Sequence, residues 1–131
     1  MPDTIPRPQS LDGSTIKFLT GCGPLYITVN RSGAQPAEVF AYFGHAGSCL
    51  DVCLSSLCKL ASVALQAGVD PDLVVHCLKG FQCQGSAWDN GRELKSCPDA
   101  IGQYVECVFD QCKEGVYESQ PSLPLQVLPN E

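Results

Sequence analysis

Residues 15–43 read TIKFLTGCGPLYITVNRSGAQPAEVFAYF, and this stretch decides the fold. It holds three segments rich in β-branched and aromatic residues, 15–20, 25–29 and 38–43, and such residues favour strands. Turn residues separate the segments: GCG at 21–23, then Asn30, Ser32 and Gly33. Because short turns join consecutive strands, the stretch predicts an antiparallel meander of three strands.

From Cys49 onwards the apolar spacing becomes that of helices. Apolar residues recur every three or four positions up to about residue 66, before Gly68, a predicted left-handed C-cap. Asp70 and Pro71 predict the start of a second helix that closes at Gly80. Residues 81–95 are polar and predict a loop or a short hairpin. The block SCPDA at 96–100 predicts the start of a third helix, with Pro98 in its first turn.

The helical spacing also predicts which residues face the core. The predicted apolar face of the first helix carries Leu50, Cys53, Leu54, Leu57, Leu60, Ala61, Ala64 and Leu65, and its polar face carries Asp51, Ser55, Lys59, Ser62 and Gln66. The second helix is predicted to bury Leu73, Val74, Cys77 and Leu78, and the third Ile101, Tyr104, Val105, Val108 and Cys112. The fold class is therefore α+β, with a three-stranded antiparallel meander packed against about three helices.

Both ends of the sequence contain several prolines among few apolar anchors, a composition that resists regular structure. We predict a single domain at 14–117, a flexible N-terminal tail at 1–13 and a flexible, proline-containing C-terminal tail at 118–131. The 44% hydrophobic content of the 131 residues is enough for one modest core without cross-links.

Charge and cysteine content restrict the function classes. The net charge of −6 argues against broad attraction to phosphate backbones, so direct nucleic-acid binding is not expected. Nine cysteines indicate either a disulfide scaffold or thiols kept for metal or redox chemistry. The odd count and an N-terminus without the pattern of a secretory signal favour reduced thiols in the cytoplasm. No apolar run is expected to span a membrane, so a soluble protein is predicted.

The nine cysteines occupy positions of different kinds. Cys53, Cys77 and Cys112 lie on apolar faces of predicted helices, where free cysteine packs as a small hydrophobic residue. Cys58, nearer a polar face, and Cys107, at the margin of an apolar stripe, are each either an exposed thiol or an edge of the core, and we assign them no role. The remaining four lie in turns or at helix starts beside glycine or proline: Cys22, Cys49, Cys83 and Cys97.

These four cysteines form the predicted metal site. Thiolates from separate segments suit a tetrahedral zinc ion, and its binding would hold the meander, the helices and the loop together. Two of the four begin predicted helices, whose positive ends favour the thiolate form that binds metal. The chain contains no CxxC pair, so the spacing alone is a weak signal. Four thiolates also suit an iron–sulfur cluster, which is the alternative cofactor.

Other candidate residues carry weaker signals. His45, in the loop GHAGSC, is interpreted as a solvated histidine, with metal or anion binding as the alternative. His76 is predicted on a helix surface. Trp88 is interpreted either as an aromatic that contacts a partner or as one folded over the core. The sequence shows no carboxylate pair, no Ser/His/Asp arrangement and no glycine-rich phosphate loop that indicates catalysis.

Four segments in order, FLTGCGPLYITVN, EVFAYFGHAGSC, GVDPDLVVHCLKGFQC and SCPDAIG, resemble the TSCPD domain family over about residues 15–113. That family occurs near the C-terminus of adenosylcobalamin-dependent (class II) ribonucleotide reductases and in free-standing relatives. Its motif cysteines correspond to Cys22, Cys49, Cys83 and Cys97, so the resemblance implies a metal site at the same four residues. The family's signature threonine is Lys95 here, which removes any contact made by the threonine side chain.

The resemblance implies a function through a partner. We expect a free-standing, zinc-binding TSCPD-type module that is accessory to or derived from ribonucleotide reductase and acts through its catalytic chain or another larger protein. The chain has no room for the reductase barrel, so it is not expected to be catalytic alone, and cobalamin would enter only through the partner. The alternatives are a subunit of a split ribonucleoside-diphosphate reductase and an iron–sulfur or metal carrier scaffold.

Overall fold

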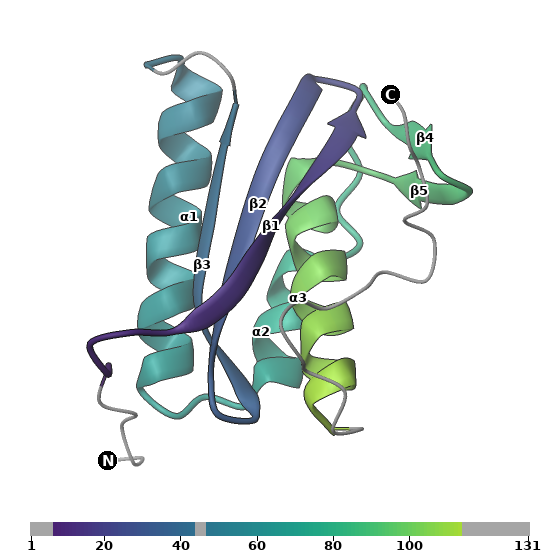
Figure 1. The fold of residues 1–131 in the computed structure, drawn as a ribbon. Helices are drawn as coiled ribbons and strands as arrows, with labels where there is room; N and C mark the ends of the chain where they lie inside the picture. Colours follow the sequence, from purple (N-terminus) through teal and green to yellow (C-terminus); the bar gives the residue numbers. More distant parts are fainter. Residues whose placement is uncertain (1–6, 44–46, 114–131) are drawn as a thin grey trace.

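The computed structural model describes residues 7–43 and 47–113. Within these ranges the chain forms a three-stranded sheet, a two-stranded hairpin and three helices (Figure 1). In chain order the elements are β1 (Asp12–Thr20), β2 (Gly23–Ser32), β3 (Gln35–Phe43), α1 (Cys49–Gln66), α2 (Pro71–Leu78), β4 (Ala87–Asp89), β5 (Arg92–Leu94) and α3 (Cys97–Lys113). The predicted α+β class and the antiparallel meander are confirmed.

The sheet has the order β1-β2-β3, with both pairs antiparallel. Phe18 lies opposite Leu25 across the first pair, and Val29 lies opposite Val39 across the second. The strands are longer than the sequence predicts. The predicted domain boundary at residue 14 lies inside β1, and the second turn falls at 33–34, where Gly33 has a φ of +64°.

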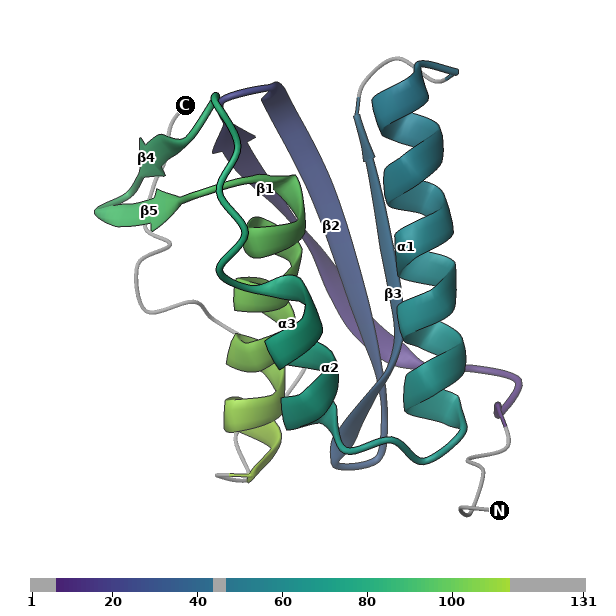
Figure 2. The ribbon, with the colours of Figure 1, turned by 180° about the vertical axis from the view of Figure 1, so that it is seen from behind.

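The helices cover one face of the sheet. Leu25, Ile27 and Val29 of β2 are completely buried, whereas Tyr26 and Thr28, which alternate with them, are partly exposed on the other face. Seen from behind, α2 and α3 lie in front of the sheet and α1 lies alongside β3 (Figure 2). The domain is therefore built of two layers, with its core between sheet and helices.

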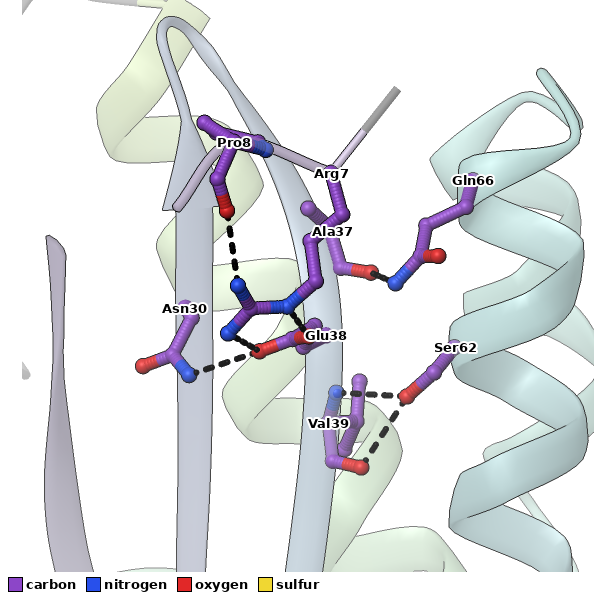
Figure 3. A network of polar contacts seen from close by, with 8 residues as sticks. All are labelled: Arg7, Pro8, Asn30, Ala37, Glu38, Val39, Ser62 and Gln66. Atoms are coloured by element: carbon purple, nitrogen blue, oxygen red, sulfur yellow. Dashed lines mark hydrogen bonds and ion pairs between the residues drawn. The ribbon is translucent and has the colours of Figure 1, made fainter. Parts of the chain in front are cut away.

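The buried face of α1 differs from the prediction. Leu50, Cys53 and Leu60 are exposed, and the buried residues are Asp51, Leu54, Cys58, Ala61, Ser62 and Leu65. The reason is that α1 covers the edge of β3. Ser62 Oγ accepts a hydrogen bond from Val39 N at 2.9 Å and donates one to Val39 O at 3.1 Å (Figure 3). Polar side chains at the edge of a sheet satisfy backbone groups that hydrophobic ones would leave unpaired.

The other two helices agree better with the sequence. All five residues of the predicted α3 stripe are buried, including Tyr104 and Cys112. On α2, Val74 and Leu78 are buried as predicted, but Leu73 and Cys77 are exposed and line an apolar groove of about 210 Å³ against α1.

By length and composition alone, α1 is able to cross a membrane, with a mean hydropathy of 1.4 over 18 residues of which 28% are buried. This corrects the expectation that no such segment exists. The core helix of a soluble protein meets the same criteria.

An ion pair joins the start of the described chain to the sheet. Arg7 Nε donates to Glu38 Oε2, and Asn30 Nδ2 donates to the other carboxylate oxygen at 3.1 Å (Figure 3). The hydrogen bond from Arg7 is the main reason that the pKa of Glu38 lies below its ordinary value. Arg7 belongs to the segment predicted to be a flexible tail, and here it makes a defined contact.

Candidate functional site

Three segments that are far apart in the sequence meet at one end of the molecule: the β1–β2 turn, the segment between α2 and β4, and the start of α3 (Figure 1). The backbones of Gly21 and Gly85 are in direct contact, because a Cβ added to Gly21 would lie 1.3 Å from Gly85 O. Cys83 N donates a hydrogen bond to Lys95 O at 3.0 Å, just before α3 begins. These contacts place Cys22, Cys83 and Cys97 in one region.

Thr20 lies at the centre of this region and is buried. Its hydroxyl donates to Gly23 O at 2.8 Å and accepts a hydrogen bond from Cys22 N at 3.1 Å. The Cys97 thiol lies 3.6 Å from the same oxygen as a further donor. Thr20 therefore fixes the turn that carries Cys22 and orients Cys97. Thr20 is not among the residues predicted from the sequence, where its one local signal is its place directly before the turn GCG.

Cys97 is the buried member of the three thiols, and Cys22 and Cys83 are exposed. Burial raises the pKa of Cys97 to about 11, and the hydrogen bond and charge of Cys22 and the charge of Cys83 act in the same direction. The expected thiolate at the start of α3 is therefore wrong for the free thiol, because burial outweighs the helix end. The same interactions show that Cys22 and Cys83 both lie close enough to Cys97 to influence its ionisation.

The block SCPD holds the start of α3 in place. Ser96 is the N-cap, since its Oγ accepts a hydrogen bond from Asp99 N at 3.2 Å. The buried Asp99 carboxylate accepts from Gly80 N at 2.9 Å, from Lys95 N at 3.0 Å and from Gln103 Nε2 at 2.8 Å. Lys95, in the place of the signature threonine, contributes through its backbone N–H and C=O. Its different side chain is therefore compatible with these contacts.

Cys49 lies apart from the other three. It is exposed at the start of α1, four residues before Cys53, and its interaction with Cys53 raises the pKa of Cys53. Cys53 was predicted to pack in the core, and it is exposed instead. Helix α1 begins at the same end of the molecule as the three-thiol region, on the far side of β2 and β3 from the β4–β5 hairpin (Figure 1).

Within residues 7–43 and 47–113, no group of three or more His, Cys, Asp or Glu side chains has the arrangement of a formed metal site. The structure thus brings three of the four predicted ligands near one another without closing a coordination sphere. Their chemistry fits a soft metal ion, because thiolates are preferred ligands of zinc. We use the name thiol cluster for Cys22, Cys83 and Cys97.

The other residues considered from the sequence lie outside the thiol cluster. His45 lies outside the described residues, and His76 is on the exposed surface of α2 as predicted. Trp88 is 70% exposed at the β4–β5 hairpin, so the interpretation of a residue folded over the core is wrong. Cys58 is a core residue whose burial raises its pKa to about 12, and burial also raises the pKa of Cys107, to about 11.

An open polar cleft of about 990 Å³ lies between α2, β5 and α3. Its walls carry both signs of charge, and Lys79 Nζ is paired with Glu106 Oε1 at 2.6 Å. Mixed charge with an internal ion pair gives no preference for an anionic ligand. The thiol cluster is therefore the better candidate for a functional site.

Comparison with known proteins agrees with the motifs in the sequence. The sequence model of the TSCPD domain matches residues 2–108 of the chain. No curated protein and no solved structure matches it.

Proposed function

Because the chain belongs to the TSCPD domain family, which is associated with ribonucleotide reductases, we propose that it is a zinc-binding module that acts through a larger, reductase-type protein chain. The observation that carries the proposal is the position of the SCPD cysteine. Cys97 is buried, interacts with Cys22 and lies near Cys83, so the cysteine of the family motif lies beside two further thiols.

Zinc binding explains the arrangement of the three thiols better than packing of their side chains does. A buried thiol with two thiol neighbours gains little from packing alone, whereas a divalent ion stabilises all three thiolates at once. Zinc would act there as a cross-link between the β1–β2 turn, the segment before β4 and the start of α3. Thr20 accepts hydrogen bonds from Cys22 N and from the Cys97 thiol, and Asp99 accepts one from Lys95 N, two residues before Cys97.

Cys49 is the fourth ligand of the site predicted from the sequence. To join the thiol cluster, its thiol would have to move away from that of Cys53. The geometry therefore supports the cluster as the main ligand set, with the fourth position filled by Cys49, by water or by the partner.

The family assignment and the exposed aromatic side chains both support the proposal that the module acts with a partner protein. The family assignment favours a soluble protein, and we propose that the module works in the cytoplasm with the chain that holds the radical chemistry and any cobalamin. Two large aromatic side chains near the cluster are exposed, Phe81 and Trp88. Exposed aromatics of this kind are common at protein interfaces.

Metal analysis of protein purified without oxygen tests this function. We expect about one zinc per chain, as a single tetrahedral site requires. The variants Cys22→Ser, Cys83→Ser and Cys97→Ser should lose the metal, whereas Cys77→Ser, an exposed thiol on α2, should keep it. A loss in Cys49→Ser as well would establish the four-cysteine site.

Unchanged metal content in all four variants at the predicted ligands would contradict the proposal. Visible absorption with bound iron would instead support the iron–sulfur scaffold. Co-purification with a separate barrel chain, together with loss of turnover but not of fold in the cysteine variants, would support the split reductase.

A further inference from the structure

Helix α1 lies beside β3 at one side of the molecule (Figure 2), and it has a second apolar side that faces away from the sheet. Its mean hydropathy is 1.4 over 18 residues, although 28% of those residues are buried. The exposed fractions of Val52, Leu60 and Val63 are 57%, 68% and 56%. Leu73 of α2, 55% exposed, extends this surface across the groove between the two helices. Exposed apolar side chains gathered in this way mark an interaction surface.

The charge of α1 limits what can cover this surface. The helix contains two charged residues, Asp51 and Lys59. Asp51 is buried and accepts hydrogen bonds from Phe43 N and Gly47 N, so Lys59 is the one exposed charge on the helix. A net charge of −6 makes two copies of the chain repel each other in most orientations. They can approach through α1, because this helix presents no exposed acidic group.

A membrane surface or a highly charged protein fits this helix less well than a second copy does. Helices that lie on membranes carry several Lys or Arg residues beside their apolar side, whereas α1 has Lys59 alone. The opposite side of α1 is packed against β3, where Ser62 is hydrogen-bonded to the backbone of Val39. A highly charged partner would find a single ionic contact on the exposed side. A second copy presents the same nearly uncharged, apolar surface.

The exposed side of α1 is also self-complementary in the size of its side chains. Cys53, Ser56, Leu60 and Val63 follow one another at intervals of three, four and three residues, which is the spacing of a coiled-coil seam, and all four are exposed. Consider two antiparallel α1 helices related by a two-fold axis midway between Ser56 and Leu60. Ser56 then lies opposite Leu60 of the second copy, and Cys53 lies opposite Val63. Each large side chain meets a small one, so the helices can pack closely.

We propose that this chain forms a homodimer through the exposed sides of two antiparallel α1 helices. With 18 residues, α1 is about 27 Å long. One side of such a helix offers less than the roughly 800 Å² per copy of a standard interface, so the dimer is weak and forms at micromolar concentrations. Lys59 lies at the margin of the pair and extends into water. The thiol cluster belongs to other elements, so dimerisation and zinc binding are separate properties.

Sedimentation velocity of the reduced full chain, without detergent, tests the dimer from low micromolar to near millimolar concentration. The mass should rise with concentration from 14.0 kDa to twice that value. Leu60→Glu and Val63→Glu should each weaken association by at least about 100-fold, because the change occurs twice in a symmetric pair and buries a charge. The matched control is Phe40→Glu, at an apolar residue of β3 that is 49% exposed, and it should leave association unchanged. Circular dichroism verifies that each variant is folded.

A mixing experiment tests the pairing of Ser56 with Leu60. Leu60→Glu and Ser56→Lys should each dimerise poorly when alone. An equimolar mixture of the two variants should associate again, because the new carboxylate and the new ammonium group then face each other across the pair. A mixture that stays monomeric, although the parent chain dimerises, would overturn the antiparallel arrangement.

Three other results would also overturn the proposal. The first is a parent chain that stays monomeric at every concentration. The second is a dimer that Phe40→Glu abolishes and Leu60→Glu does not. The third is binding of a monomeric chain to vesicles of phosphatidylcholine and phosphatidylglycerol that Leu60→Glu abolishes, because lipid would then cover α1. Zinc content is measured in parallel: loss of the dimer with zinc retained contradicts this inference alone, and a dimer without zinc contradicts the zinc-binding function alone.

Discussion

The carboxylate of Asp99 joins three parts of the domain. It accepts hydrogen bonds from the backbone after α2, from the backbone before α3 and from the side chain of Gln103 within α3. A buried carboxylate that accepts several N–H groups satisfies donors that have no other partner nearby. These contacts give the aspartate of the SCPD block a structural role at the start of α3.

Asp99→Ala should lower the free energy of unfolding by about 3 kcal/mol, because the backbone donors at Gly80 and Lys95 lose a buried, charged acceptor. Urea denaturation followed by far-ultraviolet circular dichroism measures the change. The matched control is Asp72→Ala, an exposed acidic residue in the first turn of α2, with an expected loss below about 1 kcal/mol. Equal losses in the two variants would show that Asp99 has no special structural role.

The ionisation of Cys97 depends on burial more than on its place at the start of a helix. Its pKa of about 11 lies above the ordinary value of 9.0, so the folded metal-free protein keeps this thiol protonated where an unfolded chain would begin to ionise. The folded state thus loses stability at this residue as the pH rises from about 9 towards 11.

Alkylation of reduced, metal-free protein by iodoacetamide should therefore be slow at Cys97 near pH 8 and faster as the pH approaches 11. Cys22 and Cys83 are exposed and should react first. Peptide mass spectrometry gives the rate at each site, and urea-unfolded protein provides the reference in which the three rates become similar. Modification of Cys97 as fast as that of Cys22 near pH 8 would contradict the buried, protonated thiol.

At the scale of elements, the contact between Gly21 and Gly85 holds the thiol cluster together. The two glycines are not equivalent. A Cβ on Gly21 would overlap Gly85 O at 1.3 Å, whereas a Cβ on Gly85 would lie 3.3 Å from the backbone of Gly21. Since backbone atoms cannot move aside as a flexible side chain can, the first position excludes any side chain and the second nearly accepts one.

Gly21→Ala should separate the β1–β2 turn from the segment that carries Cys83, lower stability by about 3 kcal/mol and weaken zinc binding. Gly85→Ala adds the same methyl group on the other side of the contact and should cost less than about 1 kcal/mol. Thermal denaturation and zinc titration compare the two variants. If both bind zinc as the parent chain does, the contact does not position the cluster.

Apolar periodicity in the sequence predicted the buried residues correctly where a helix packs only against apolar side chains. The α3 stripe lies against an apolar core, so every residue predicted to be buried there is buried. Helix α1 lies against the edge of β3. There, backbone groups without a partner strand form hydrogen bonds with polar side chains such as Ser62 and Asp51. Apolar periodicity cannot anticipate this choice, and it placed Leu60 inside although it is 68% exposed.

At the scale of the whole molecule, the local sequence pattern also failed to predict which candidate site residues lie together. The four predicted cysteines share the same local features, next to glycine or proline in turns and at helix starts. Their grouping depends on tertiary contacts, which bring Cys22, Cys83 and Cys97 together and leave Cys49 beside Cys53. Local sequence thus selected four cysteines of one kind, and packing between distant segments divides them into two sets.

The position of α1 also bears on whether the domain is soluble. A membrane-spanning helix would face lipid with its apolar side chains, but α1 uses Ser62 and Gln66 to satisfy β3, with Gln66 Nε2 donating to Ala37 O at 3.1 Å. Similarly, Asp89 accepts a hydrogen bond from Leu19 N at 3.0 Å and covers part of the opposite edge at β1. Both edges of the sheet thus have polar cover from the rest of the domain, as expected of a unit that folds in water.

This arrangement predicts that Ser62→Ala destabilises the domain by about 2 kcal/mol, because Val39 N and O lose their shared partner in a buried place. Ser56→Ala makes the same change on the exposed side of α1 and should alter stability by less than about 0.5 kcal/mol. Urea denaturation without detergent measures both. Equal effects would mean that α1 does not pack against β3 in solution, and the apolar surface of α1 would then have to be covered by a membrane or by another protein.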